Sequence, residues 1–211
     1  MAEITNIAIA GVGGQGILLA SDVVASAALC AGHDVKKNEL HGMAQRGGSV
    51  ISEVRFGAKV HSPVVADGQV DMLLALELLE GLRNAHRLRS SGLVIADDLR
   101  IRPAVRPPGA PGYPEDVADR LRASAARVIV IPATDLAKQA GNARAANTVL
   151  VGALSQHLPF AVEAWQEALR TCLRPALVQI NLRAFQLGRE AALRPIRQAQ
   201  GKQAQGRPHR S

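Results

Sequence analysis

The feature that most limits what this chain can form is a short apolar run that ends in a cluster of glycines. The run is Ile4–Ala10, and Gly11-Val12-Gly13-Gly14-Gln15-Gly16 follows it directly. The next stretch, Gly14–Ala31, is rich in Ala, Leu and Val, is long enough for a helix, and is ended by Gly32. Because glycine reaches backbone conformations with positive φ, this order predicts a buried strand, a tight turn and a helix.

The remainder of the chain alternates between strand-like and helix-like segments, within a length of 211 residues that suits one large domain. The strand-like segments are Asp34–Leu40, Ser49–Phe56, Met72–Leu76, Leu93–Ala96 and Val128–Ile131. The helix-like segments are Glu77–Leu88, Glu115–Ala126, Ala143–Gln156, Ala161–Cys172 and Pro175–Glu190. This alternation indicates an α/β fold, with a Rossmann-like, mainly parallel sheet, helices on both faces and a helical C-terminal third. The alternation of polar and apolar residues within 49–56 predicts that Glu53 and Arg55 face water.

Two segments fall outside this pattern. Arg102–Pro114 contains five prolines, which exclude regular structure and predict a long surface loop. Residues 194–211 carry five of the seven net positive charges, no acid and few apolar side chains. We expect one domain over residues 1–193 and a disordered basic tail over 194–211. The tail is interpreted as a solubilising or incidental extension, with a polyanion-binding arm as the alternative.

Composition excludes several classes of function. Aromatic residues make up only 2% of the chain, too few for a base-stacking platform, so no nucleic-acid partner is expected. The two cysteines, Cys30 and Cys172, lie far apart in the sequence, and the six histidines show no metal-binding spacing. We therefore expect no metal and no iron–sulfur cluster in this chain. Neither a signal peptide nor an apolar run of about 18 residues is present, so we expect a cytoplasmic protein with no membrane partner.

The glycine turn is the first candidate site, with Gly11, Gly13, Gly14, Gln15 and Gly16 as its residues. Glycines allow close backbone approach, and a helix N-terminus offers free N–H groups to an anion. NAD binding requires an acid at the end of the second strand, where this sequence instead places Lys36 and Lys37. Three interpretations stay open: NAD binding, glycines that serve tight packing alone, and binding of an acyl carrier or phosphate group.

The second candidate site is His41-Gly42-Met43-Ala44-Gln45-Arg46-Gly47-Gly48-Ser49-Val50. In this glycine-flanked loop, Gln45 and Arg46 present an amide and a planar guanidinium that suit a carboxylate or a phosphate. Taken alone, His41 can equally be interpreted as a structural histidine, and Arg46 as a solvated or salt-bridged surface arginine. Together with Gly47 they form a candidate anion-binding loop. Elsewhere, Glu77 and Glu80 are spaced as a carboxylate pair, but a solvated helix face shared with Arg83 is the preferred interpretation.

Gly11–Gly16 followed by His41–Val50 at this spacing resembles the gamma domain of the 2-oxoacid:ferredoxin oxidoreductases. Two further stretches, Gly141–Leu154 and Leu182–Glu190, are also similar to that family. The similarity covers residues 4–190 and leaves out the proline-rich segment and the tail. As a free chain of this length, the sequence is most similar to the beta subunits of indolepyruvate ferredoxin oxidoreductases.

The resemblance implies a heteromeric complex. A large alpha subunit would hold thiamine diphosphate, Mg²⁺ and 4Fe–4S clusters, and the complex would oxidatively decarboxylate indolepyruvate or a related aryl 2-oxoacid. The acyl group would pass to coenzyme A and the electrons to ferredoxin. The gamma domain would pack beside the thiamine site and help to hold coenzyme A. We expect no catalytic residue in this chain, no cofactor bound by it alone and no activity without its partner.

Three alternatives are kept. The nearest is the gamma subunit of a pyruvate or 2-oxoglutarate ferredoxin oxidoreductase. A second, from another class, is a free-standing nucleotide-binding dehydrogenase, which would bind NAD alone. The third is a nucleic-acid-binding protein that uses residues 194–211, whose binding would fall steeply with salt.

Overall fold

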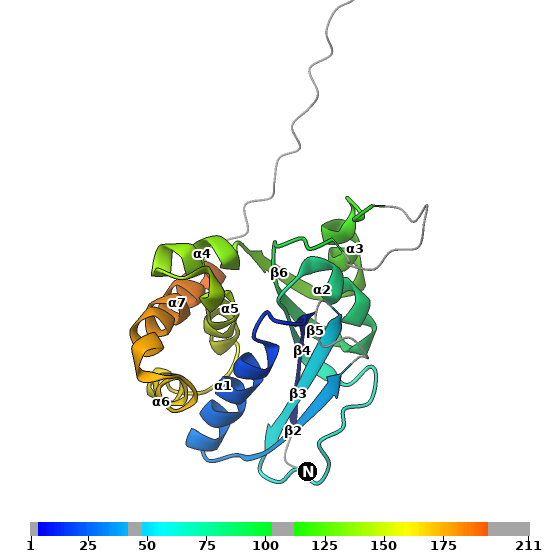
Figure 1. Ribbon diagram of the computed structural model, residues 1–211. Helices are drawn as coiled ribbons and strands as arrows, with labels where there is room; N and C mark the ends of the chain where they lie inside the picture. Colours follow the sequence, from blue (N-terminus) through cyan, green and yellow to red (C-terminus); the bar gives the residue numbers. More distant parts are fainter. Residues whose placement is uncertain (1–3, 42–47, 103–111, 194–211) are drawn as a thin grey trace, which may run out of the picture.

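A computed structural model describes residues 4–41, 48–102 and 112–193, and its centre is a single mixed sheet (Figure 1). The strands are β1 (Thr5–Val12), β2 (Asp34–His41), β3 (Ser49–Gly57), β4 (Val70–Ala75), β5 (Leu88–Asp97) and β6 (Arg127–Ile131). Their order in the sheet is β2-β3-β1-β4-β5-β6. β1, β4, β5 and β6 pair in parallel, whereas β3 is antiparallel to both of its neighbours. The predicted α/β fold with a mainly parallel sheet is confirmed.

Helices cover both faces of this sheet, as predicted. They are α1 (Ile17–Cys30), α2 (Leu78–Asn84), α3 (Val117–Ser124), α4 (Ala133–Ala140), α5 (Ala146–Ser155), α6 (Val162–Cys172) and α7 (Pro175–Leu193), with 3-10 turns η1 (Ala85–Arg87) and η2 (Ala143–Ala145). Figure 1 shows α1 and α4–α7 on one side of the sheet and α2 and α3 on the other. The C-terminal third is helical, as expected.

Alternation along the central strand explains why both faces are covered. In β1, Ile7 and Ile9 enter the core beneath α1 and α4–α7, whereas Ala8 and Ala10 enter the core beneath α2 and α3. All four side chains are fully buried. A strand buried on both faces has no polar face, which accounts for its continuous apolar sequence.

Three predicted boundaries are wrong for local reasons. The first helix begins at Ile17 and not at Gly14, because Gly14 and Gly16 have φ of 99° and 81° and belong to the turn. The predicted helix 77–88 ends at Asn84 and continues only as η1, because β5 begins at Leu88. Leu88 pairs with Val70 of β4, so this strand starts five residues before the predicted Leu93.

The prediction of a water-facing side on β3 is wrong for Glu53, whereas Arg55 on the same side is half-buried. Glu53 is completely buried, and Arg87 forms an ion pair with its carboxylate. The backbone N–H of Val65 also donates to Glu53, at 3.4 Å. The segment between β3 and β4 therefore covers this part of the sheet and brings donors to a carboxylate that the sequence pattern placed in water.

Several predicted features lie outside the described residues. These are most of the histidine-glycine loop (42–47), the core of the proline-rich segment (103–111) and the basic tail (194–211). The last described helix, α7, ends at Leu193. Within the described ranges, every helix is too short or too polar to cross a bilayer.

Candidate functional site at the carboxyl edge of the sheet

The glycine turn at the end of β1 is shaped by contacts that need the absence of a Cβ atom. The N–H of Gly13 donates to the carbonyl of Gly48 at 2.9 Å, and Gly14 and Gly16 adopt positive φ. A Cβ atom at Gly11 would lie 2.7 Å from Oε1 of Gln15. The glycines thus serve the geometry of the turn, as the packing interpretation requires.

Gln15 ties two strand ends together. Its Oε1 accepts from the N–H of Val12 at 2.6 Å, and its Nε2 donates to the carbonyl of Leu76 at 2.8 Å. Leu76 follows β4 directly and itself donates from its N–H to Ala10 of β1. The side chain of Gln15 therefore braces the carboxyl ends of β1 and β4 while it lines the cavity described below.

A second brace comes from α5. Nδ2 of Asn147 donates to the carbonyl of Gly16 at 3.1 Å, and a Cβ atom at Gly16 would lie 2.5 Å from that nitrogen. Oδ1 of Asn147 accepts from the N–H of Thr148. The close approach of Asn147 to the backbone explains why Gly16 has no side chain, and it holds the first turn of α1 against α5.

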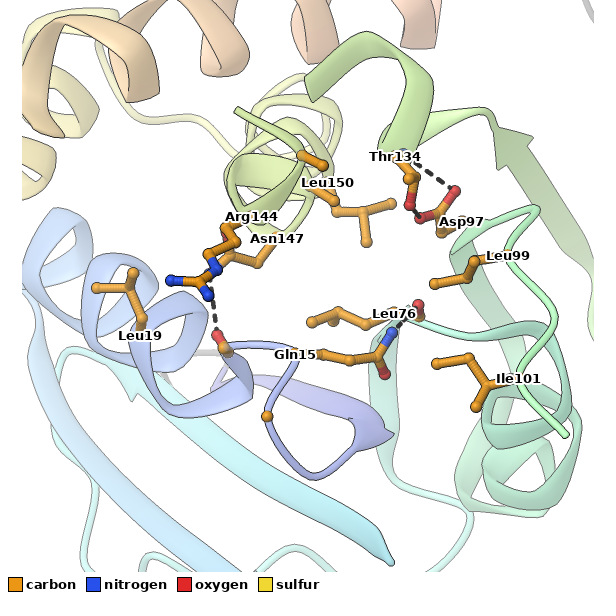
Figure 2. A pocket seen from close by; sticks show the side chains of 14 residues that line it. Gln15, Leu19, Leu76, Asp97, Leu99, Ile101, Thr134, Arg144, Asn147 and Leu150 are labelled. Atoms are coloured by element: carbon orange, nitrogen blue, oxygen red, sulfur yellow. Dashed lines mark hydrogen bonds between the residues drawn. The ribbon is translucent and has the colours of Figure 1, made fainter. Parts of the chain in front are cut away.

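These braces form one wall of a cavity of about 450 Å³ at the carboxyl edge of the parallel strands. Figure 2 shows Arg144, Asn147 and Leu19 on one side of this cavity and Leu99 and Ile101 on the other. The lining residues are Gly14, Gln15, Gly16, Leu19, Leu76, Asp97, Leu99, Ile101, Thr134, Ala143, Arg144, Ala146, Asn147 and Leu150. Ligands of open α/β sheets bind at this edge, so the cavity is the candidate binding site.

The electrostatics at the α1 side of the cavity favour an anion. Among the residues that the structure describes, no side chain caps the N-terminus of α1, and the first turn of this helix contains no acid. Arg144 is exposed, and among the described residues its guanidinium has no partner. A helix N-terminus and a free guanidinium together attract a phosphate or a carboxylate.

The structure brings the ends of the histidine-glycine loop to this same edge. His41 is the last residue of β2 and pairs with Val50 of β3, and Val50 pairs on its other side with Gly11. The two motifs, separated in sequence, are therefore neighbours in the sheet. Gln45, Arg46 and Gly47 lie outside the described residues, and the roles assigned to both loops stay predictions.

The strand order is unfavourable to NAD binding of the usual kind. In that mode the strand that follows the glycine-rich helix lies beside β1 and presents an acid to the ribose. Here β3 lies between β1 and β2. Lys36 pairs with Asp34 at 3.3 Å, and Lys37 pairs with Asp22 and Glu39. Both lysines therefore have acidic partners and do not line the cavity.

The predicted solvated pair Glu77 and Glu80 is wrong, because both side chains are buried. Glu77 accepts from the hydroxyl of Tyr113 at 2.5 Å, and burial, followed by this hydrogen bond to Glu77, raises the pKa of that hydroxyl above its ordinary range. Glu80 accepts from Oγ of Ser49 at 2.5 Å and pairs with Arg83. The predicted contact with Arg83 is present, but it neutralises a buried acid.

Sequence reasoning missed much of the cavity wall. Asp97 ends β5, Leu99 and Ile101 lie in the segment after it, and Thr134 and Asn147 lie in the first turns of α4 and α5. Arg144 stands in Gly141–Leu154, a stretch that carries the family resemblance. A rule that the residue directly after each predicted strand is a site candidate would have found Asp97, because the predicted strand ends at Ala96.

The fold and the edge cavity define a Rossmann-like α/β domain with a candidate ligand site. A model of the family described as pyruvate ferredoxin/flavodoxin oxidoreductase matches residues 6–191. The chain belongs to this family.

Relatives and solved structures agree with this assignment. The chain is 41% identical to an indolepyruvate oxidoreductase subunit IorB of Archaeoglobus fulgidus, with 89% of this chain and 95% of the relative covered. It is 40% identical to an IorB subunit of Thermococcus kodakarensis over the same shares. Its structure resembles a keto/oxoacid ferredoxin oxidoreductase gamma subunit of Geobacter sulfurreducens, with a TM-score of 0.68, 28% identity and coverage of 91% and 98%.

Proposed function

We propose that this chain is the small subunit of an indolepyruvate:ferredoxin oxidoreductase and completes the active site of a large catalytic subunit. The observation that carries the proposal is the match of about 40% identity to IorB subunits over 95% of their length. A 2-oxoglutarate synthase subunit KorC of Methanothermobacter thermautotrophicus matches at 31%. The higher sequence identity to the IorB subunits favours an aryl 2-oxoacid over the pyruvate and 2-oxoglutarate alternatives.

In this proposal the large partner holds thiamine diphosphate, Mg²⁺ and the 4Fe–4S clusters, and ferredoxin takes the electrons from the complex. The partner's thiamine would supply the decarboxylation chemistry. This chain contributes the carboxyl edge of its sheet, where the open N-terminus of α1 and the guanidinium of Arg144 favour an anion. We assign to this edge a phosphate of coenzyme A or the carboxylate of the substrate, held together with Gln45 and Arg46.

The function is tested on the complex formed with the large partner. Indolepyruvate, coenzyme A and a viologen dye should give turnover with the complex and none with either chain alone. Turnover by this chain alone would contradict the proposed division of labour. A preference of the complex for pyruvate or 2-oxoglutarate would move the assignment to one of those enzymes.

The contribution of the histidine-glycine loop is tested by Arg46→Ala in the same complex. Loss of one charge-assisted contact of about 1.5–3 kcal/mol should lower kcat/KM by roughly 10–100-fold while assembly stays intact. Arg46→Lys should recover only part of the activity, because an ammonium group lacks the bidentate fork.

Gel filtration beside the kinetics distinguishes a binding role from an interface role. If Arg46→Ala dissociates the complex and the remaining complex has normal constants, Arg46 is an interface residue. Arg122→Ala is the matched control, since Arg122 is exposed on α3 and pairs only with Asp119 among the described residues. Unchanged activity in an intact Arg46→Ala complex would remove Arg46 from the site.

A further inference from the structure

The wall of the cavity at the end of β5 has the opposite chemistry from the α1 side. Asp97 is buried, and its Oδ1 accepts from the N–H groups of Ala133 and Thr134 at 2.9 and 3.4 Å. Its Oδ2 accepts from Oγ1 of Thr134 at 2.7 Å. Because the Thr134 hydroxyl hydrogen points to Asp97, both side chains can offer only lone pairs to the cavity. A ligand that reaches this wall must bring a hydrogen-bond donor.

Between the two ends the lining is mostly apolar, with the amide of Gln15 as a polar group whose oxygen and nitrogen bond to Val12 and Leu76. Leu76, Leu99, Ile101 and Leu150 face the space between Arg144 and Asp97 (Figure 2). The cavity therefore matches a ligand with an anionic group at one end, a flat apolar body in the middle and a donor at the far end. Its volume of about 450 Å³ lies in the range of sites for small organic ligands.

We propose that Asp97 is a specificity-determining residue that accepts a hydrogen bond from the exocyclic amino group of an adenine ring in this cavity. The proposal rests on the proposed function, because coenzyme A brings an adenine nucleotide to the complex. Its phosphates reach the N-terminus of α1 and Arg144, and its base lies between the leucines and Ile101. An aryl 2-oxoacid also joins an anion to a flat ring, and indolepyruvate adds an N–H donor. The cavity volume favours the larger nucleotide, whose phosphates suit the N-terminus of α1 and the guanidinium of Arg144.

The chemistry of position 6 of the purine makes the proposal testable. Adenine carries an amino donor there, whereas hypoxanthine carries an oxygen that would face the carboxylate of Asp97. A site built to bind one donor rejects the analogue that lacks it, because its buried acceptor is left unpaired. The complex should therefore have a KM for coenzyme A that is at least about tenfold lower than for the hypoxanthine analogue obtained by deamination.

Asp97→Asn gives the sharper test. The asparagine keeps an oxygen for the N–H groups at the start of α4 and places an NH₂ group where Oδ2 stands. The preference should disappear or invert in favour of the hypoxanthine analogue. Asp135→Asn is the matched control, because Asp135 lies in the first turn of the same helix, is exposed, pairs with Lys138 and does not line the cavity. It should leave the preference unchanged.

Each outcome decides the proposal. Equal KM values for coenzyme A and its hypoxanthine analogue in the wild-type complex would overturn the proposal. This outcome needs no variant and so decides the proposal even if Asp97→Asn does not fold. An equal rise in the KM values for coenzyme A and its hypoxanthine analogue in Asp97→Asn would also overturn the proposal, because it would show a purely structural role for Asp97. A change confined to the KM for indolepyruvate would assign the cavity to the aryl substrate and overturn the proposal.

A separate measurement distinguishes this inference from the proposed function. If the complex shows no turnover that depends on coenzyme A, the proposed function fails, and binding of ADP and IDP to the full chain decides the role of Asp97. A preference for ADP that Asp97→Asn abolishes supports the inference. Equal binding of ADP and IDP, or binding of neither, overturns it.

Discussion

The two faces of the sheet are buried in different ways. The face beneath α1 and α4–α7 is largely apolar apart from the buried Asp97 at its edge. It includes a run of touching rings, with centroids 5.2 Å apart for Phe56 and Phe160, 5.7 Å for Phe160 and Trp165 and 6.1 Å for Trp165 and Phe185. The face beneath α2 and α3 instead buries four charged side chains. They are Glu53, Glu77, Glu80 and Arg87.

The difference shows what each face does. Apolar contacts stabilise the fold but are not directional. Hydrogen bonds to a buried carboxylate are directional, so they specify which backbone segment lies beside it. Glu77 accepts from the N–H of Ile101 and from the hydroxyl of Tyr113, which lie on either side of residues 103–111. Glu80 accepts a hydrogen bond from Ser49, near the end of the histidine-glycine loop His41–Val50. The polar face thus positions segments at the cavity edge, and the apolar face anchors the helices behind them.

The largest effect is expected from Arg87→Met, which removes the partner of a fully buried acid. Arg87 forms ion pairs with Glu53 and, at 3.2 Å, with Asp67. Leaving Glu53 unpaired should lower the free energy of unfolding by about 3–5 kcal/mol, measured by urea denaturation. Arg122→Met, which breaks an exposed pair, should cost less than about 1 kcal/mol.

The double variant Glu53→Leu/Arg87→Met sharpens this test, because it removes the buried charge together with its partner. It should regain most of the stability that Arg87→Met loses. If Arg87→Met costs no more than the Arg122 control, the buried pair does not stabilise this face.

A smaller effect is expected on the apolar face, where α5 and α7 cross with their backbones in contact. A Cβ atom at Gly188 would overlap the carbonyl of Val149, and one at Gly152 would overlap the carbonyl of Phe185. Gly188→Ala should lower the free energy of unfolding by about 2–3 kcal/mol, because two packed helices must move apart. Gly112→Ala is the control, since open space surrounds that position. Equal stability of the two variants would show that the crossing is looser than described.

The smallest effect is expected from Asp98→Asn, and it depends on pH. Burial, then the charge of Asp97, raises the pKa of Asp98 to about 6, whereas the ordinary value is 3.8. The raised pKa favours the folded state below about pH 4, and this contribution is lost as the pH rises through 6. Because Asp98 is partly exposed, solvent screening reduces its effect to about 1 kcal/mol.

The variant should therefore be more stable than the wild type at pH 7 and no more stable at pH 4, as measured by thermal unfolding at both values. Asp119→Asn serves as the control, because Asp119 is an exposed acid on α3 that pairs with Arg122. A gain that is the same at both pH values would contradict the assigned cause. The test also sharpens the comparison of the two faces, since the buried acids beneath α2 have donors whereas Asp98 faces another acid.

Much of the fold could be predicted because the signals were local. The apolar run before Gly11 and the glycines that follow it specify a strand, a turn and a helix within 30 residues. Alternation then indicated the α/β class and the helical C-terminal third. The glycine turn lies at the cavity because the ends of parallel strands meet at one edge, and its binding role stays a prediction.

The missed features depend on contacts between distant segments. Whether Glu53 meets water depends on Arg87, 34 residues away, and whether Glu80 does depends on Ser49, 31 residues away. A Glu side chain on an alternating strand or in a helix is predicted from the local sequence to face solvent, because no local pattern reveals a donor that lies far away in the chain.

The sequence alone determined the class of fold, the sharp turn after β1 and the family to which the chain belongs, because residue type and spacing encode these locally. The tertiary structure decided the insertion of antiparallel β3 between β1 and β2, the burial of the acids, and the cavity bounded by Gln15, Asp97 and Arg144. These three side chains come from separate strand ends and helix starts. Their meeting depends on strand order, which is a property of the whole packed sheet and of no single segment.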